Sequence, residues 1–283
     1  MNVHDVSLLQ CPESGAALAF HGTNVELQIQ DGVLICAETG TAWTVELGLA
    51  NLVRRRWALG SEGAVAEKLD KAPRFIEPAF AAMSLMLGAG RAATFRQKVV
   101  EKLELDQLAG QARARVLEIG MGTGANLEPV LDNAPDETIV EFWGTELSAG
   151  AAVVSRERVE VNPQWSQRVS QFLAASHKLP FKDGIFDRVM LVGGVDCLTD
   201  RKASLAEAAR VCAPGGFVML VDKQPDAADG PGVLAKVMLK RLAAATSHPQ
   251  AAPLDDVPPG AEVLENSQLT PVHYCLRFRP APR

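Results

Sequence analysis

The sequence predicts an α/β protein with a doubly wound, mainly parallel sheet, preceded by a small β module and a helical lid. Three observations lead to this prediction. From Arg113 onward, apolar runs ending in glycine alternate with helical segments, the pattern of right-handed βαβ units. Residues 1–53 contain short alternating strands and turns, and residues 61–108 have helical spacing interrupted by prolines and glycines. We therefore divide the chain into a β module at 1–53, a linker and lid at 54–110, and a main domain at 111–283.

Each element of the main domain follows from its local pattern. Buried apolar runs predict strands at 114–120, 139–146, 168–175, 186–194 and 215–222, and "HYCLRFRP" at 273–280 predicts a final edge strand. Amphipathic spacing predicts helices at 125–134, 148–159, 204–213 and 232–245. Ser148 is the expected cap of the second helix, and Ser204 with Glu207 forms a predicted capping box in the third. In the lid, Thr94 and Gln97 predict a capping box that opens a helix at 95–103.

Composition and charge restrict the function. The 283 residues are 47% hydrophobic and 22% charged, and no segment has the 18 or so apolar residues needed to span a membrane. Residues 1–53 hold six acidic residues and no Lys or Arg, a charge of −6 that equals the net charge of the whole chain. Such a module is a poor binder of nucleic acid, because Lys and Arg neutralise phosphates. Five scattered cysteines and the absence of a basic leader favour a cytoplasmic protein, and a homo-oligomer is compatible with the sequence.

The stretch "VLEIGMGTG" at 116–124 carries the most specific chemistry. A strand that delivers three glycines to the start of a helix lets the backbone approach a ligand closely and points free amides at it. Glu146 ends the next strand, where a carboxylate can accept hydrogen bonds from ribose hydroxyls. The glycines alone also match the G-x-G-x-x-A pattern of nicotinamide-binding proteins.

Further motifs separate these alternatives. Glu118 stands two residues before the first glycine, "HKLPFKDGIFDRV" follows the third strand, and "RVCAPGGFVML" leads into the fifth. Together, over roughly 92–225, they resemble class I S-adenosylmethionine-dependent methyltransferases, in particular the branch of the ubiquinone and menaquinone methyltransferases. The resemblance implies a Rossmann-like fold, a methyltransferase activity and S-adenosyl-L-methionine as the cofactor.

The resemblance also implies where the cofactor would bind. Glu118 would reach its methionine end, Glu146 its ribose and Leu147 its adenine. Alanine at position 175 departs from the family, which usually has an acidic residue there. The implied cofactor positions are Glu118, Gly120, Met121, Gly122, Thr123, Gly124, Asn126, Glu146, Leu147, Ala175, Ser176, His177, Val192 and Gly193.

Methyl transfer needs mainly a positioned acceptor, and a base only where the acceptor keeps a proton. Asp196, just past the fourth strand, and His177 are the residues we expect to act on the substrate; the alternatives are a loop-capping carboxylate and a surface histidine. The acceptor pocket is expected to lie between lid residues 75–95, the stretch around Asp196, and the helix at 232–245. The apolar lid residues are Phe75, Phe80, Met83, Met86 and Leu87.

The N-terminal module resembles small zinc-ribbon-like domains that accompany methyltransferases. Their pattern places a second cysteine three residues after each first one, but here Ser14 follows Cys11 and Thr39 follows Cys36. Hydroxyl groups are poor zinc ligands compared with thiolates, so we expect a metal-free module that packs on the main domain.

Three functions remain open from the sequence. The leading one is methyl transfer to a small, fairly apolar molecule. The alternatives are methylation of a base in ribosomal or transfer RNA, and a non-catalytic scaffold protein that binds the cofactor. The acidic module and the 5% content of aromatic residues oppose RNA binding, and the intact glycines oppose the scaffold.

Overall fold

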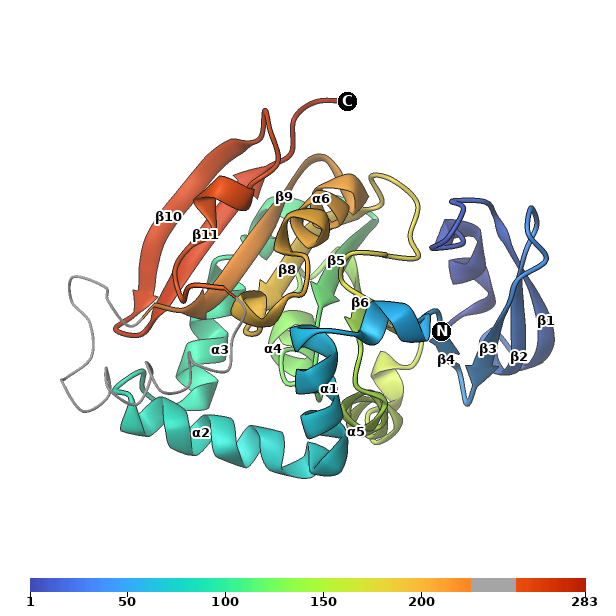
Figure 1. The fold of residues 1–283 in the computed structure, drawn as a ribbon, viewed down its shortest axis with the longest axis horizontal. Helices are drawn as coiled ribbons and strands as arrows, with labels where there is room; N and C mark the ends of the chain where they lie inside the picture. Colours follow the sequence, from blue (N-terminus) through green and yellow to red (C-terminus); the bar gives the residue numbers. More distant parts are fainter. Residues whose placement is uncertain (225–247) are drawn as a thin grey trace.

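The computed structural model describes residues 1–224 and 248–283, so the helix predicted at 232–245 lies outside the described residues. Its strands form one eleven-stranded sheet with the order β1-β2-β3-β4-β7-β6-β5-β8-β9-β11-β10 (Figure 1). The parallel centre consists of β5 (Arg113–Ile119), β6 (Ile139–Glu146), β7 (Val169–Leu173), β8 (Phe186–Val192) and β9 (Cys212–Lys223). The strand order reverses at β5, which lies between β6 and β8. Ligands of such sheets bind at this switch point, beyond the carboxyl ends of the strands.

The strands of the N-terminal segment extend this sheet. They are β1 (Leu18–Val25), β2 (Gln28–Cys36), β3 (Ala42–Glu46) and β4 (Leu49–Asn51). Successive strands pair antiparallel, but β4 pairs parallel with β7 through Ala50 opposite Phe172. The expectation that the segment packs on the main domain is confirmed. The sheet is continuous between the two parts, because β4, before the predicted boundary at residue 53, is hydrogen-bonded to β7 of the main domain. The division into separate domains there stays a prediction.

The opposite end of the sheet differs from the sequence prediction. The predicted edge strand is β11 (His273–Arg279), but it lies inside the sheet, antiparallel to both β9 and β10 (Glu262–Thr270). The edge strand is β10, which we did not predict. Most of its residues are exposed or half-buried, so it lacks the apolar alternation by which a strand is found in a sequence.

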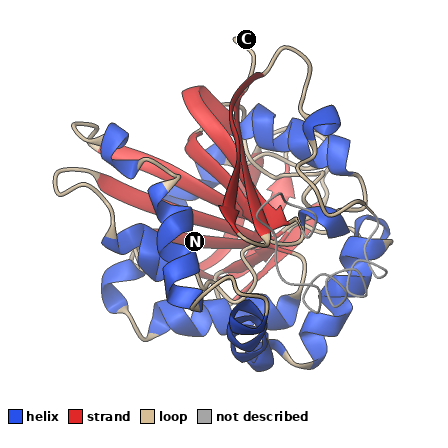
Figure 2. Cartoon of the chain, turned by 90° about the vertical axis from the view of Figure 1, so that its left-hand side faces the viewer, coloured by secondary structure: helices blue, strands red, loops and turns tan. Residues whose placement is uncertain are grey.

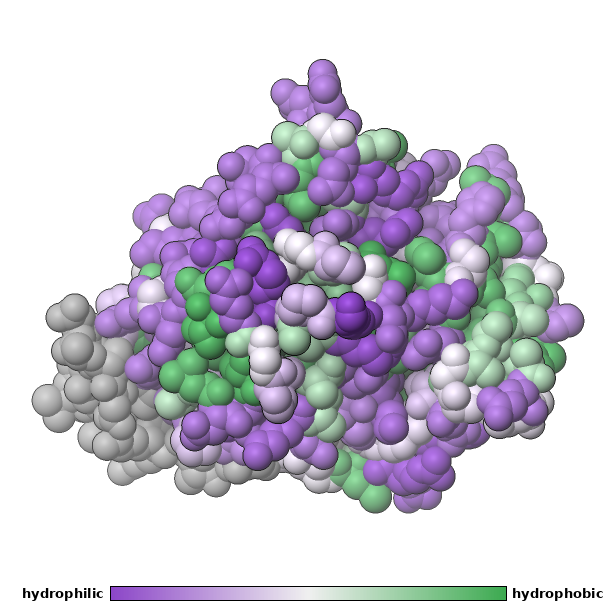
Figure 3. Space-filling model, turned by 90° about the horizontal axis from the view of Figure 1, so that it is seen from above, coloured by the Kyte–Doolittle hydropathy of each residue, from purple (hydrophilic) through white to green (hydrophobic). Residues whose placement is uncertain are grey.

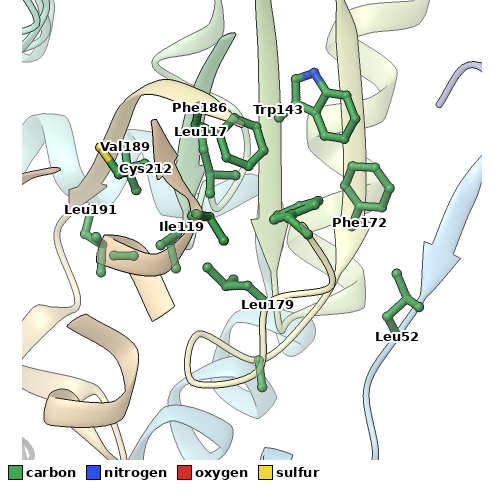
Figure 4. Packing of buried hydrophobic residues seen from close by; sticks show 14 of the residues in the cluster. Leu52, Leu117, Ile119, Trp143, Phe172, Leu179, Phe186, Val189, Leu191 and Cys212 are labelled. Carbon is green, nitrogen blue, oxygen red and sulfur yellow. The ribbon is translucent and has the colours of Figure 1, made fainter. Parts of the chain in front are cut away.

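Helices cover both faces of the sheet (Figure 2). On one face, α6 (Arg201–Val211) packs on a core that includes Trp143, Phe172 and Phe186 and continues to Leu52 (Figure 4). On the other face lie α3 (Ala92–Glu101) and α4 (Leu127–Asp132), whose side chains join a second core with Val116 and Phe142. The helix α5 (Ala149–Glu160) follows β6 and packs on β7.

The lid consists of three helices: α1 (Ser61–Lys71), α2 (Ile76–Met86) and α3 (Figure 1). The predicted cap at Ser148 is confirmed, because its hydroxyl accepts a hydrogen bond from the Ala151 amide. Two predicted capping boxes were wrong: α3 begins two residues before Thr94, and Asp200, not Ser204, caps α6. Asp200 accepts the Ala203 amide, whereas Glu207 of the supposed box accepts the amide of Leu179.

None of the helices in residues 1–224 and 248–283 has the length and apolar character needed to cross a bilayer. The face shown in Figure 3 is mostly hydrophilic, with small hydrophobic areas between. Scattered exposed apolar residues of this kind are ordinary on protein surfaces.

Candidate active site

The glycine turn predicted from the sequence follows β5. Gly122 has a φ of 55° and Gly124 a φ of 73°, in the left-handed region that side chains with a Cβ rarely adopt. A Cβ on Gly124 would also stand 2.3 Å from the Ser155 hydroxyl of α5, so this glycine allows the turn to pack against that helix. The turn therefore needs glycine both for its backbone angles and for its contact with α5.

Glu146 connects the end of β6 to this turn. Its carboxylate accepts hydrogen bonds of 2.8 Å from the backbone amides of Gly122, Leu147 and Ser148. Burial raises the pKa of the Glu146 carboxyl, and the hydrogen bonds from these amides partly oppose that rise. The carboxylate is thus fixed at the switch point with acceptor capacity left over.

Glu118 and Asn126 form a second polar pair beneath the turn. Both side chains are buried, and the Asn126 amide donates a 2.6 Å hydrogen bond to Glu118. The Oε2 atom of Glu118 and the Oδ1 atom of Asn126 have no hydrogen-bond partner among the described residues. Burial raises the pKa of Glu118 to about 8. Two buried acceptors without a donor indicate a place for a cationic or N–H-bearing ligand group.

Two adjoining cavities meet at the glycine turn. The first, which we call the Glu146 cavity, has a volume of about 290 Å³ and reaches from the ends of β5, β6 and β8 to α1. Its lining includes Glu62, Leu69, Gly120, Gly122, Glu146, Leu147, Ala174, Ser176, Val192, Gly193 and Leu198. It joins residues from three parallel strands, and a lid helix closes it on one side.

The second cavity, the His273 cavity, has a volume of about 210 Å³. Its apolar lining comes mainly from α2, α3 and β9: Phe80, Met83, Leu87, Phe95 and Val221. Its polar lining comprises Glu77, Arg96, Glu118, Thr123, Asn126, Asp222, Lys223 and His273. The two cavities share Ile76, Gly120, Gly122, Val192 and Gly193. One extended ligand can therefore reach from one cavity into the other past the glycine turn.

Charged groups gather where β9 ends in the His273 cavity. The Lys223 ammonium lies 3.3 Å from the Asp196 carboxylate and 3.7 Å from that of Asp222. Burial lowers the pKa of Lys223, but the two carboxylates outweigh it and raise the pKa overall, so the ammonium stays charged. His273 shares a 2.7 Å hydrogen bond with Thr270 and packs on the Phe95 ring. Burial, and to a lesser extent Lys223, lowers the pKa of His273 to about 4, so this imidazole is neutral at pH 7.

Most of the predicted cofactor positions line one of the cavities. Those that do are Glu118, Gly120, Met121, Gly122, Thr123, Asn126, Glu146, Leu147, Ser176, Val192 and Gly193. Gly124 faces α5, and Ala175 is fully buried in the core, with its neighbour Ala174 at the lining instead.

The two residues expected to act on the substrate lie elsewhere. Asp196 is buried and lines neither cavity; its carboxylate is engaged by Lys223 and Gln250. His177 is half-buried, also outside both linings, and its Nδ1 atom has no partner among the described residues. The expectation of direct contact is therefore revised: Asp196 reaches the His273 cavity through Lys223.

Sequence reasoning missed several lining residues. Glu62 and Arg96 belong to lid helices far from the strand motifs. His273 opens the predicted strand β11, whose place beside β9 the sequence did not indicate. Lys223 was also missed, although its position could have indicated a place in the site. It stands directly after Asp222 at the carboxyl end of the fifth parallel strand.

In the N-terminal module, Cys11 and Cys36 are both buried. Burial tends to raise the pKa of the Cys36 thiol, but hydrogen bonds from Ser14 and Thr39 outweigh it and lower the pKa to about 6. No group of three or more potential metal ligands occurs in the described part of the chain. The expectation of a metal-free module stays a prediction.

The fold and the paired cavities define the class of protein: an α/β domain with a glycine turn and a strand-end carboxylate at the switch point, as in nucleotide-binding doubly wound sheets. Comparison with known proteins shows what this part of the chain is similar to. Residues 117–220 match the family model described as "Methyltransferase domain". This match supports a class I methyltransferase domain with S-adenosylmethionine as its cofactor.

Curated relatives agree with this assignment. The chain is 28% identical over 148 residues to the ubiquinone/menaquinone biosynthesis C-methyltransferase UbiE of Geobacter sulfurreducens, covering 52% of this chain and 54% of that protein. It is 26% identical over 167 residues to the demethylmenaquinone methyltransferase of Thermus thermophilus, covering 59% of this chain and 71% of that protein. The chain thus spans about half the length of the first of these relatives.

Solved structures share the fold at low identity. The mitomycin 7-O-methyltransferase MmcR aligns with a TM-score of 0.58 at 18% identity, covering 79% of this chain and 61% of that one. An S-adenosylmethionine-dependent methyltransferase of Thermotoga maritima aligns with a TM-score of 0.51 at 18% identity, covering 77% and 99%. At this identity the likeness concerns the fold alone.

Proposed function

We propose that this protein transfers a methyl group from S-adenosylmethionine to a small, fairly apolar acceptor of the quinol type that binds in the His273 cavity. The observation that carries this proposal is the junction of the two cavities at Gly120, Gly122, Val192 and Gly193. A cofactor with its nucleoside in the Glu146 cavity would pass the glycine turn and present its methyl group to the apolar part of the His273 cavity. The names of the curated relatives, which refer to quinone biosynthesis and C-methylation, support a ring carbon as the acceptor atom.

The residues present fit the cofactor. Glu146 offers acceptors for ribose hydroxyls, and the unpartnered Oε2 of Glu118 and Oδ1 of Asn126 offer acceptors for an α-ammonium group. Arg96 lines the same cavity and supplies guanidinium donors for a carboxylate. Arg96 is held in place by Glu77, which also accepts a 2.9 Å hydrogen bond from Thr123.

Bound S-adenosylmethionine supplies an electrophilic methyl group, so the protein has to position the acceptor and handle its proton. The apolar wall of Phe80, Met83 and Leu87 suits a flat hydrocarbon ring. At the polar end, the Lys223 ammonium can stabilise a phenolate oxygen, which makes the neighbouring ring carbon nucleophilic. Before this hydroxyl loses its proton to form the phenolate, neutral His273 can accept a hydrogen bond from it, and Asp196 acts as a positioning residue for Lys223.

The test is methyl transfer from radiolabelled S-adenosylmethionine to separate pools of reduced isoprenoid quinone precursors, soluble phenols and RNA. The Gly122→Arg variant is the negative control, because a side chain at this turn would enter the space shared by both cavities. We expect label in a small phenolic product with the wild-type protein and none with the variant. Label only in RNA would contradict the acceptor class, and cofactor binding without transfer to any pool would favour a scaffold role.

A further inference from the structure

We propose that the carboxylate of Glu62, on lid helix α1, recognises the exocyclic amino group of the cofactor's adenine and so selects the base. This inference rests on the proposed function, because it places the nucleoside end of the cofactor in the Glu146 cavity. It gives the N-terminal lid helix a part in cofactor choice as well as in closing the site.

Glu62 lies in the first turn of α1 and lines the Glu146 cavity. Its carboxylate accepts a 3.0 Å hydrogen bond from the hydroxyl of Ser176, which follows β7. Leu147, after β6, and Leu198, after β8, line the same cavity. Apolar side chains from two strand ends therefore flank a carboxylate in a pocket next to Glu146, an arrangement suited to a flat base with a donor on its edge.

The backbone around Glu62 is fixed against the segment after β8. The Ser61 hydroxyl donates a 2.8 Å hydrogen bond to the Cys197 carbonyl, and the Glu62 amide donates to the Thr199 hydroxyl at 3.3 Å. Gly60, with a φ of 88°, lets the chain pass so close to Thr199 that a Cβ would stand 2.7 Å from its methyl carbon. These contacts hold the first turn of α1 at the cavity, so the Glu62 carboxylate is positioned before a ligand arrives.

The Glu62 carboxylate also has unused acceptor capacity. A carboxylate offers about four lone-pair sites. The Ser176 hydroxyl occupies one of them, and the backbone amides of Ser176 and Thr199 also interact with the carboxylate, which leaves room for one further donor. Burial raises the pKa of Glu62, and these hydrogen bonds from Ser176 and Thr199 only partly oppose the rise. A partly desolvated carboxylate gains from a further N–H donor, and an adenine amino group provides one.

The strand end itself provides no such acceptor. Position 175, after β7, is an alanine whose side chain is buried in the core, and the adjacent lining residue at 174 is also alanine. Glu62 brings a carboxylate to this end of the cavity from a different part of the chain.

The experiment compares two ligands by titration calorimetry: S-adenosylhomocysteine and its analogue whose purine lacks the 6-amino group. The proteins are the wild type, Glu62→Ala, Glu62→Gln and the control Glu67→Gln. Glu67 lies on the same helix, but its side chain is 73% exposed and pairs with Lys71. We expect the wild type and the control to prefer S-adenosylhomocysteine by about tenfold or more, the scale of a hydrogen bond to a charged group.

In Glu62→Ala this preference should fall below about twofold, because only the ligand with the amino group loses a hydrogen bond. Glu62→Gln, which keeps a neutral acceptor, should give an intermediate ratio. An unchanged ratio in Glu62→Ala would overturn the inference and leave Glu62 with the structural role of holding α1 to Ser176. Tighter binding of S-adenosylhomocysteine would also overturn it, because Glu62 would then hinder ligand binding. If Glu62→Ala fails to fold, the ratio in Glu62→Gln decides. Failure of the wild type to bind S-adenosylhomocysteine would instead contradict the proposed function.

Discussion

The side-chain amide of Asn126 donates a 2.6 Å hydrogen bond to Glu118, while Oε2 of Glu118 and Oδ1 of Asn126 have no partner within the described residues. This buried pair is costly in the free protein, because burial penalises ionisation of the carboxyl group and the amide oxygen lacks a donor. A ligand ammonium would satisfy both atoms. We infer that the Glu118–Asn126 pair lowers the stability of the free protein and strengthens cofactor binding.

The first prediction concerns both effects of the Glu118 carboxyl group, on cofactor affinity and on stability. Glu118→Gln should lower the affinity for S-adenosylhomocysteine by about tenfold or more, because a hydrogen bond to a charged group contributes about 1.5–3 kcal/mol. The same variant should be more thermally stable than the wild type at pH 8.5 without ligand, since glutamine carries no charge to desolvate. Calorimetry and thermal unfolding measure the two effects. A variant that loses stability but keeps its affinity would show that Glu118 is only structural.

The second prediction concerns pH. The pKa of Glu118 is raised from its usual 4.5 to about 8 by burial, with Asn126 and Arg96 opposing the rise and Glu146 and Glu77 adding to it. A raised pKa stabilises the free fold below about pH 4.5, and this contribution is lost as the pH rises through 8. A bound ammonium favours the carboxylate, so binding at pH 7 should release a proton.

Titrations at pH 7 in two buffers of different ionisation enthalpy measure that release. It should diminish above pH 8, where the carboxyl group of the free protein is already ionised. It should be absent in Glu118→Gln. Equal proton release by the wild type and this variant would assign the proton to another group.

The parallel centre of the sheet was predictable because its strands are largely apolar runs, and all but β7 have a glycine or a carboxylate at the end. Glu118, the glycines and Glu146 could be found for the same reason: they follow from the local pattern around a strand end. Glu62, Arg96 and His273 could not, because their place depends on how the lid and the final hairpin fold back over the strand ends. Their sequence neighbours carry no sign of that contact.

A third prediction uses two methionines of the same helix. Met83 lines the His273 cavity, whereas Met86, which the sequence also suggested, is 66% exposed and lines neither cavity. Met83→Glu should strongly reduce methyl transfer, because a charge in the apolar wall is costly to desolvate. Its affinity for S-adenosylhomocysteine should change little. Met86→Glu should behave as the wild type in both measurements, and equal losses in the two variants would argue against an acceptor site here.

A fourth prediction separates the roles of Lys223 and Asp196. Lys223→Met should lower kcat for a phenolic acceptor by about a hundredfold, the scale of losing one donor to a developing oxyanion. Asp196→Asn should cause a smaller fall, because Asp222 also holds the ammonium, at 3.7 Å. Neither change should alter S-adenosylhomocysteine affinity. If Lys223→Met loses that affinity, Lys223 binds the cofactor carboxylate and not the acceptor.

The N-terminal module retains the two cysteine-containing turns expected of a zinc ribbon, at Cys11 and Cys36, but each turn lacks its second thiolate. The Gly15 amide donates a 2.8 Å hydrogen bond to the Cys11 carbonyl, and the Gly40 amide donates one of 2.9 Å to the Cys36 carbonyl. Ser14 stands three residues after Cys11, and its hydroxyl lies 3.4 Å from the Cys36 sulfur. Thiolates around tetrahedral zinc are about 3.8 Å apart, given zinc–sulfur bonds of about 2.3 Å. The 3.4 Å between the Ser14 hydroxyl and the Cys36 sulfur is therefore close to the distance between two thiolates bound to one zinc ion.

The fifth prediction is that the wild-type module binds no zinc and that the double variant Ser14→Cys/Thr39→Cys creates a site for it. Four thiolates on two such turns match a structural zinc site, and bound metal stabilises the folded state. Elemental analysis of protein purified without chelator should give far less than one zinc per chain for the wild type and about one for the double variant. Chelator should then lower the unfolding temperature of the double variant alone, and adding Cys11→Ser should remove its zinc. Stoichiometric zinc in the wild type, lost in Cys11→Ser, would instead mean that side chains other than thiolates complete a native site.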